Sequence, residues 1–174
     1  MMRGKIFILL IFLLAFFLSG FGLVYRYTQT NEVIGFWGPT GSQSISSPDR
    51  VELCALTPRN DQSVDESGDP DILIEGRRYA IESRKDVTKA PGFNNASGAL
   101  ILNRNYDWRP RVENPDCRPA WKHALIYRHG ENRTVVAISV SCGWVYSQAT
   151  HRVAGLNKSV TEGLARLFQE QLGS

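Results

Sequence analysis

The sequence lacks the short motifs that identify many enzymes and cofactor-binding domains. It contains no Gly-x-Ser-x-Gly nucleophile motif and no His-Glu-x-x-His zinc motif. The glycine-containing stretch at residues 38–42 is not followed by the lysine that a phosphate-binding loop requires. His123 and His129 are six residues apart on one expected strand, about 20 Å, which is too far for a shared metal ion. We therefore expect no catalytic, cofactor-binding or metal-binding residues.

The chain also lacks the excess of basic residues that binding to nucleic acid requires. Its formal net charge is +3, but Arg3, Lys5 and Arg26 account for all of it. From Tyr27 onward, 17 basic residues balance 17 acidic ones. Neutralising a phosphate backbone needs basic residues concentrated on one face. We therefore expect no nucleic-acid partner.

Charge is absent from one long stretch, the twenty residues Ile6–Tyr25. A helix of that length covers about 30 Å, the thickness of the hydrocarbon core of a bilayer. Arg3 and Lys5 precede the stretch and only Arg26 follows it closely, so the positive-inside rule places the N-terminus in the cytoplasm. Residues 1–27 are therefore predicted to anchor the protein in the lipid bilayer of a bacterial cytoplasmic membrane, with the remainder outside.

A cleaved signal peptide is the alternative for the same segment. Residues 6–18 have the length of a signal-peptide core, and Gly20 and Gly22 are small enough for a cleavage site. Hydrophobicity nevertheless continues to Tyr25, and Tyr25 and Tyr27 are typical of a membrane interface. These residues favour a retained anchor, whereas cleavage would give a secreted protein. In both cases the C-terminal part lies outside the cytoplasm.

Composition divides the rest of the chain into two parts. Residues 28–50 are rich in Gly, Ser, Thr and Pro and are predicted to form a linker. Residues 51–174 are long enough for one extracytoplasmic domain with its own core, beginning with a strand at Val51–Leu56. The clearest hairpin joins His123–His129 to Arg133–Cys142 through a three-residue turn.

The C-terminal segment has the pattern of an amphipathic helix. Ser159 and Glu162 form a capping box at its start. Its apolar residues fall on one side of the expected helix and form a single stripe, made of Val160, Leu164, Leu167, Phe168 and Leu172. The predicted fold class is therefore α+β, with an N-terminal transmembrane helix followed by a small antiparallel sheet packed against this C-terminal helix.

Several local patterns occur together in the C-terminal part of the chain. They are Val51-Glu52-Leu53, Gly76 between two strands, Cys117-Arg118-Pro119 before a strand, and an apolar strand at residues 136–142. Together they resemble an uncharacterised family of short bacterial membrane-anchored proteins, over about residues 51–172. In that family a second strand ends in an apolar run and Cys-Phe-x-Cys, whereas residues 142–145 keep only the first cysteine, so no metal or redox role is carried over. The resemblance implies the fold and the location but no activity.

Three cysteines outside the cytoplasm allow one disulfide. If residues 128 and 134 pair across the hairpin turn, Cys142 lies close to the proline-bounded loop that contains Cys117. We therefore expect a Cys117–Cys142 disulfide. Cys54 is then left as a free thiol, and a lone cysteine on a strand is usually a buried small apolar residue.

The loop that precedes this hairpin combines aromatic and arginine residues, which are enriched in the most tightly binding parts of interfaces. We expect a binding surface there, made of Tyr106, Trp108, Arg109, Arg111, Arg118 and Trp121. In the alternative, the tryptophans only anchor the loop to the core while the arginines are solvated.

These features favour an extracytoplasmic domain that binds another envelope protein or a ligand and carries out no chemistry. The alternative is a cell-envelope enzyme whose site is assembled from dispersed residues. A deep pocket lined by converging polar groups would favour the enzyme, and a flat surface of Trp and Arg would favour binding.

Overall fold

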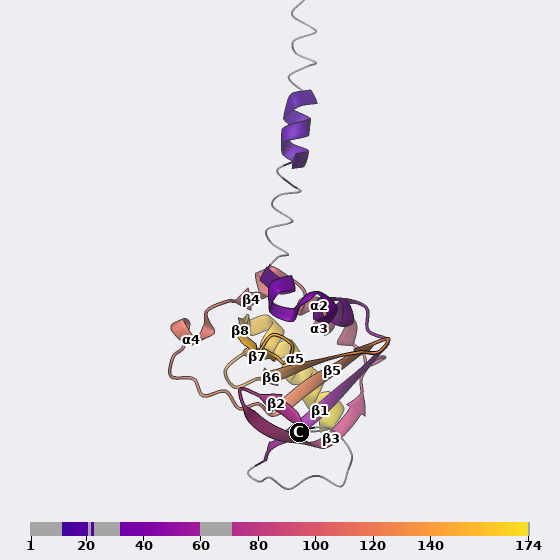
Figure 1. The fold of residues 1–174 in the computed structure, drawn as a ribbon, viewed down its shortest axis with the longest axis vertical. Helices are drawn as coiled ribbons and strands as arrows, with labels where there is room; N and C mark the ends of the chain where they lie inside the picture. The colour runs from indigo at the N-terminus through magenta and orange to yellow at the C-terminus, as the bar shows by residue number, and fades with distance from the viewer. Residues whose placement is uncertain (1–11, 21, 23–31, 60–70, 174) are drawn as a thin grey trace, which may run out of the picture.

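A computed structural model of the chain describes residues 12–20, 22, 32–59 and 71–173. Its centre is an antiparallel sheet of eight strands in the order β2-β3-β1-β5-β6-β7-β8-β4 (Figure 1). The strands are β1 (Arg50–Pro58), β2 (Ile72–Ile74), β3 (Arg77–Asp86), β4 (Tyr106–Asp107), β5 (His123–His129), β6 (Asn132–Ser139), β7 (Trp144–Ser147) and β8 (Arg152–Leu156). The helices are α2 (Pro39–Ser46), α3 (Phe93–Ala99), α4 (Pro110–Glu113), α5 (Lys158–Leu172) and the short 3₁₀ helix η1 (Asn103–Asn105). The expected α+β class and antiparallel sheet are confirmed.

Two hairpins turn through only two residues each. Glu75 and Gly76 join β2 to β3 with φ of 48° and 79°, the left-handed values that such turns favour. Gly130, with φ of 56°, opens the turn between β5 and β6. In this second hairpin residue 129 pairs with residue 132 and residue 128 with residue 133. The expected three-residue turn is therefore wrong, and the pairing is shifted by one residue.

Strand β6 is shorter than expected and ends at Ser139. Val136 and Ile138 face the helices, as their alternation predicts. Cys142 does not continue that stripe, because it lies in the turn after the strand and packs at the edge of the opposite face.

The sheet buries apolar side chains on both faces. On one face the sheet packs against α2, α3 and α5, and Figure 1 shows α5 running across the strands. The opposite face carries a second apolar cluster that contains Trp121, Trp144 and Tyr146. Central strands therefore alternate between two buried sides, so that on β5 Leu125 points to the helices and Ile126 to the second cluster.

Helix α5 forms the main cover of the helical face. Asn157, and not Ser159, caps its N-terminus, since the Asn157 side-chain oxygen accepts a hydrogen bond from the Val160 amide at 3.0 Å. Ser159 instead donates from its hydroxyl to the same oxygen. The predicted stripe is present, because Leu164, Leu167 and Phe168 are buried and the other two residues are partly buried against the same cluster.

The described part of the expected linker packs into the core. Residues 32–37 are helical, α2 follows, and the side chains of Phe36 and Trp37 are fully buried. The Trp37 indole N–H donates to the carbonyl of Leu100 at 2.9 Å, which joins this segment to the end of α3. The folded body therefore begins before Val51, because apolar burial outweighs the low helix propensity of a Gly/Ser/Thr-rich segment.

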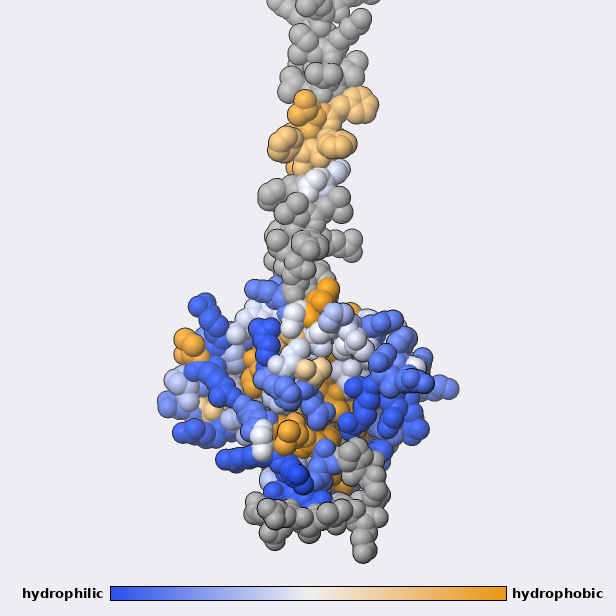
Figure 2. All heavy atoms as spheres, viewed as in Figure 1, coloured by the Kyte–Doolittle hydropathy of each residue, from blue (hydrophilic) through white to orange (hydrophobic). Residues whose placement is uncertain are grey.

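The described residues 12–20 form a helical segment apart from this body (Figures 1 and 2). Its large apolar side chains are exposed, Phe12 to 74% and Phe16 to 85%, and Figure 2 shows them as an apolar band. No helix within the described ranges is both long and apolar enough to cross a membrane. Residues 6–11, 21 and 23–25 of the expected span lie outside the described residues.

Candidate ligand-binding groove

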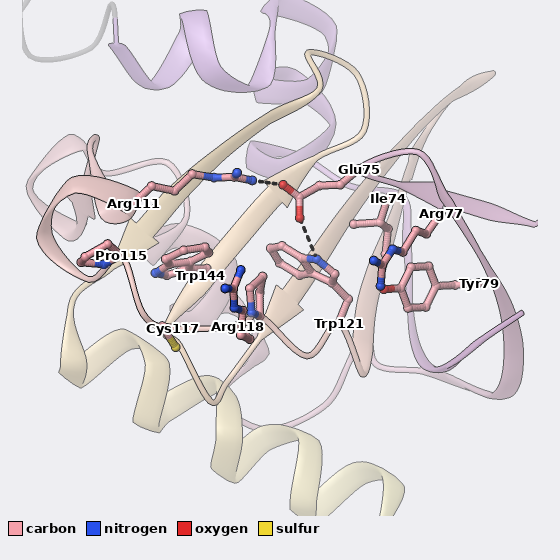
Figure 3. Close-up of a pocket in the computed structure, with 11 residues that line it drawn as sticks. Ile74, Glu75, Arg77, Tyr79, Arg111, Pro115, Cys117, Arg118, Trp121 and Trp144 are labelled. Atoms are coloured by element: carbon pink, nitrogen blue, oxygen red, sulfur yellow. Dashed lines mark hydrogen bonds and ion pairs between the residues drawn. The ribbon is translucent and has the colours of Figure 1, made fainter. Parts of the chain in front are cut away.

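A cavity of about 410 Å³ opens beside the β2–β3 turn, on the face of the sheet opposite the three helices (Figure 3). Buried aromatic side chains form part of its lining, namely Tyr79, Trp121 and Trp144. Its charged lining residues are Glu75, Arg77, Arg111 and Arg118. We call this cavity the arginine groove.

Three separate segments bring the aromatic residues of the groove together. Tyr79 lies on β3, Trp144 begins β7, and Trp121 comes just before β5. All three belong to the second apolar cluster. Tyr79 and Trp144 point to that face from their strands, whereas Trp121 reaches it from the loop before β5. The Trp121 and Tyr146 rings are 6.0 Å apart between centroids, which holds Trp121 against the strands.

The loop that carries Arg118 is held by a covalent link and a hydrogen bond. A disulfide joins Cys117 to Cys142, the pair that the hairpin predicts, with 5.9 Å between the Cα atoms. Three residues further on, the Ala120 amide donates to the Ser139 hydroxyl at 3.0 Å. Arg118 lies between these two attachments, so the disulfide positions part of the groove.

One carboxylate is present among the three arginines. Arg111 donates to the Glu75 carboxylate, and the Trp121 indole N–H donates to its other oxygen at 3.2 Å (Figure 3). The Arg111 guanidinium also lies over the Trp144 ring, 5.9 Å from its centroid. Within the described part of the chain, Arg77 and Arg118 form no ion pair. The charged lining therefore has a formal charge of +2 and two guanidinium groups without a carboxylate partner.

Two of the expected surface residues pack against the helical core. The rings of Tyr106 and Trp108 stack with centroids 4.6 Å apart, and both contact Phe36 at the helical core. The Tyr106 hydroxyl donates to the Leu100 carbonyl, and the Trp108 indole donates to Asn103 at 3.0 Å. These aromatic residues anchor their loop to the core, as the alternative interpretation holds.

Arg109 lines a second, adjacent hollow of about 300 Å³. Glu75 and Arg111 line both hollows. Of the six expected residues, the structure therefore brings Arg111, Arg118 and Trp121 together in the arginine groove and places Trp108 and Arg109 beside it, in the lining of the second hollow. Tyr106 lines neither of these two hollows.

Among the charged and aromatic residues of the groove, sequence reasoning missed four, which are Glu75, Arg77, Tyr79 and Trp144. They lie up to 69 positions apart in the sequence, so spacing alone does not connect them. One local signal is present, since a Glu-Gly pair between two expected strands marks a tight turn at which the glutamate is unusual.

A second ionic cluster is structural. Glu52 is 3% exposed, and its carboxylate contacts Arg50 at 3.1 Å and Arg84 at 3.5 Å. Cys54, on the same side of β1, is fully buried and free. Burial raises the pKa of its thiol to about 11, although Arg84 lowers it. Such a thiol is inert at neutral pH.

Comparisons with family models, with curated proteins and with solved structures give no significant match. Across the described ranges, no group of three or more His, Cys, Asp or Glu side chains is placed to hold a metal ion. The functional argument therefore rests on the arginine groove itself.

Proposed function

We propose that this chain is a single-pass, membrane-anchored envelope protein whose extracytoplasmic domain binds an acidic segment of a partner protein in the arginine groove. The observation that carries the proposal is the excess of guanidinium groups around a cavity with one carboxylate. A planar guanidinium matches a carboxylate with two parallel hydrogen bonds. Two of the three arginines have no such partner in the described chain and are exposed for one.

The lining of the groove favours binding over catalysis. Its residues include neither serine nor histidine, and its one cysteine, Cys117, is oxidised in the disulfide. Burial raises the pKa of the Tyr79 phenol, so this group stays protonated at neutral pH. Glu75 is engaged by Arg111 and Trp121. The cell-envelope enzyme remains the alternative, but this groove supplies neither a nucleophile nor an available base for it.

The burial of the indole rings of Trp121 and Trp144 favours an acidic peptide over a ligand that stacks on aromatic rings. Trp121 and Trp144 are each only 4% exposed, so they form a floor and present no open ring face. A sugar ring or an unstacked base needs such a face for stacking. The arginines, in contrast, are exposed, which suits the carboxylates of an acidic peptide segment.

The membrane part of the proposal rests on residues 6–25 and their flanking charges. A reporter that is active only outside the cytoplasm, fused after Ser174, should be active. The protein should remain with membranes after a carbonate wash. An inactive reporter would contradict the orientation, and release into the soluble fraction would instead support the secreted alternative, with cleavage near Gly22.

Binding can be tested with a fluorescein-labelled hexaglutamate peptide and the full-length protein in detergent, by fluorescence anisotropy. Replacing Arg118 or Arg77 by Gln should weaken binding by about fivefold each, since each removes one partly screened charge contact worth about 1 kcal/mol. Arg166→Gln is the matched control, because Arg166 is also exposed but lies on α5, away from the groove. Equal effects at all three positions would show non-specific attraction and contradict the proposed site.

A further inference from the structure

Glu75 occupies the position in the arginine groove where an acidic ligand is expected. Its carboxylate accepts hydrogen bonds from Arg111 and from the Trp121 indole (Figure 3). An arginine combined with an indole N–H is a carboxylate-binding pair, because both groups only donate. The protein therefore already contains one carboxylate bound in this site, supplied by its own turn.

The backbone at Glu75 indicates that its side chain has a role. Its φ of 48° lies in the left-handed region, where Gly, Asn and Asp are the favoured residues of such turns. For glutamate this left-handed backbone conformation is unfavourable. The contacts of its carboxylate with residues 111 and 121 are its evident compensation.

The contact between Glu75 and Arg111 is weak enough to exchange. The Arg111 side chain is 62% exposed and the Glu75 side chain 30%. Ion pairs with this much solvent access shift an equilibrium by about fivefold or less. The pair also stands between the two adjacent hollows, since both residues line each of them. A carboxylate entering from solvent can therefore compete for the same donors.

We propose that Glu75 is an internal competitor of the arginine groove, which the carboxylate of the acidic partner displaces from Arg111 and Trp121. This inference rests on the proposed function and specifies its chemistry. The ligand group is a carboxylate, and binding moves Glu75 away from the groove. Arg77 and Arg118 then hold further acidic groups of the same segment.

The test uses the same hexaglutamate peptide with the full-length protein. Glu75→Gln keeps the size of the side chain and removes its charge, whereas Glu75→Asn suits the left-handed turn and shortens the side chain. Both variants should bind the peptide about two- to fivefold more tightly than the unmodified protein, because no internal carboxylate has to be displaced. Adding Arg111→Gln to Glu75→Gln should abolish that gain.

Glu131→Gln is the matched control, since Glu131 also lies in a two-residue hairpin turn but outside the groove. It should leave the affinity unchanged. A clamp role for Glu75, in which it only holds the groove in shape, predicts weaker binding in both variants and would overturn the inference, as would unchanged affinity. If the unmodified protein and all variants fail to bind the peptide, the proposed function itself is refuted. If the unmodified protein binds and the variants bind no better, only the competitor is refuted.

Discussion

Removing the Cys117–Cys142 cross-link should destabilise the domain by about 3.5 kcal/mol. The disulfide joins residues separated by 25 positions in the sequence. The loss of loop-closure entropy in the unfolded chain for a loop of that size corresponds to about 3.5 kcal/mol at 25 °C. For a domain of this length, such a change lowers Tm by roughly 10 to 15 °C. Both cysteines lie at the edge of the second apolar cluster, so alanine at these positions removes little packing.

Urea denaturation of a Cys117→Ala/Cys142→Ala variant measures this difference directly. A reductant should destabilise the unmodified protein by a similar amount and leave the double variant unchanged. Cys54→Ala is the control, since it keeps the cross-link and should cost no more than about 2 kcal/mol. A double variant within about 1 kcal/mol of the unmodified protein would refute the entropic reasoning. A reductant without effect on the unmodified protein would show that the two cysteines are not joined.

Three further predictions concern single side chains. The His123 ring stacks on Phe168, and burial lowers the pKa of His123 below its unfolded value near 6.5. The unfolded state therefore binds more protons, and the free energy of unfolding should fall as pH decreases from about 7 to 5. His123→Gln should remove that part of the pH dependence in urea titrations. The Cys54 thiol should resist an aromatic disulfide reagent in the native protein and react once urea unfolds the chain, whereas rapid native reaction would contradict its burial. Asn157→Ala should cost about 1 kcal/mol through loss of the α5 cap, and an unchanged urea midpoint would show that Ser159 caps the helix instead.

The strands with a strong local pattern are predictable from the sequence. Strand β5 has the bounds His123–His129 in both the prediction and the structure, because polar residues flank a short apolar run. The turn after it is misplaced by one residue, since Gly130 suits two-residue and three-residue turns equally. Strands β7 and β8 were not predicted, because segments of four and five residues carry little periodic signal.

Long-range burial explains the largest difference in the fold. Composition alone makes residues 28–50 a linker, yet Phe36 and Trp37 are buried in the main core and Ile45 of α2 is 1% exposed. Their partners, such as Leu100, are more than 50 residues away in the sequence. A short helix of low propensity is stabilised only by such contacts, which local patterns do not reveal.

The candidate site was only partly predictable, because it too depends on contacts between segments that are distant in the sequence. The expected loop supplied Arg111, Arg118 and Trp121 because its composition marks it as an interaction segment. The other side of the groove comes from the β2–β3 hairpin, whose position depends on sheet order. Tyr106 shares the composition signal but turns toward the helices, since β4 pairs with β8 at the far edge of the sheet.

The burial of residues 36 and 37 has a mechanical consequence. Tension on the chain before residue 32 reaches the domain at residues 33–37. Val33 is buried in the helical core, the Trp37 indole donates to the Leu100 carbonyl, and the Thr150 hydroxyl donates to the Phe36 carbonyl. These attachments belong to the helical face of the sheet, and the arginine groove lies on the opposite face. Force applied along the N-terminal segment therefore acts on the helical layer before it reaches the β2–β3 turn, so the domain can bear such force while the arginine groove keeps its shape.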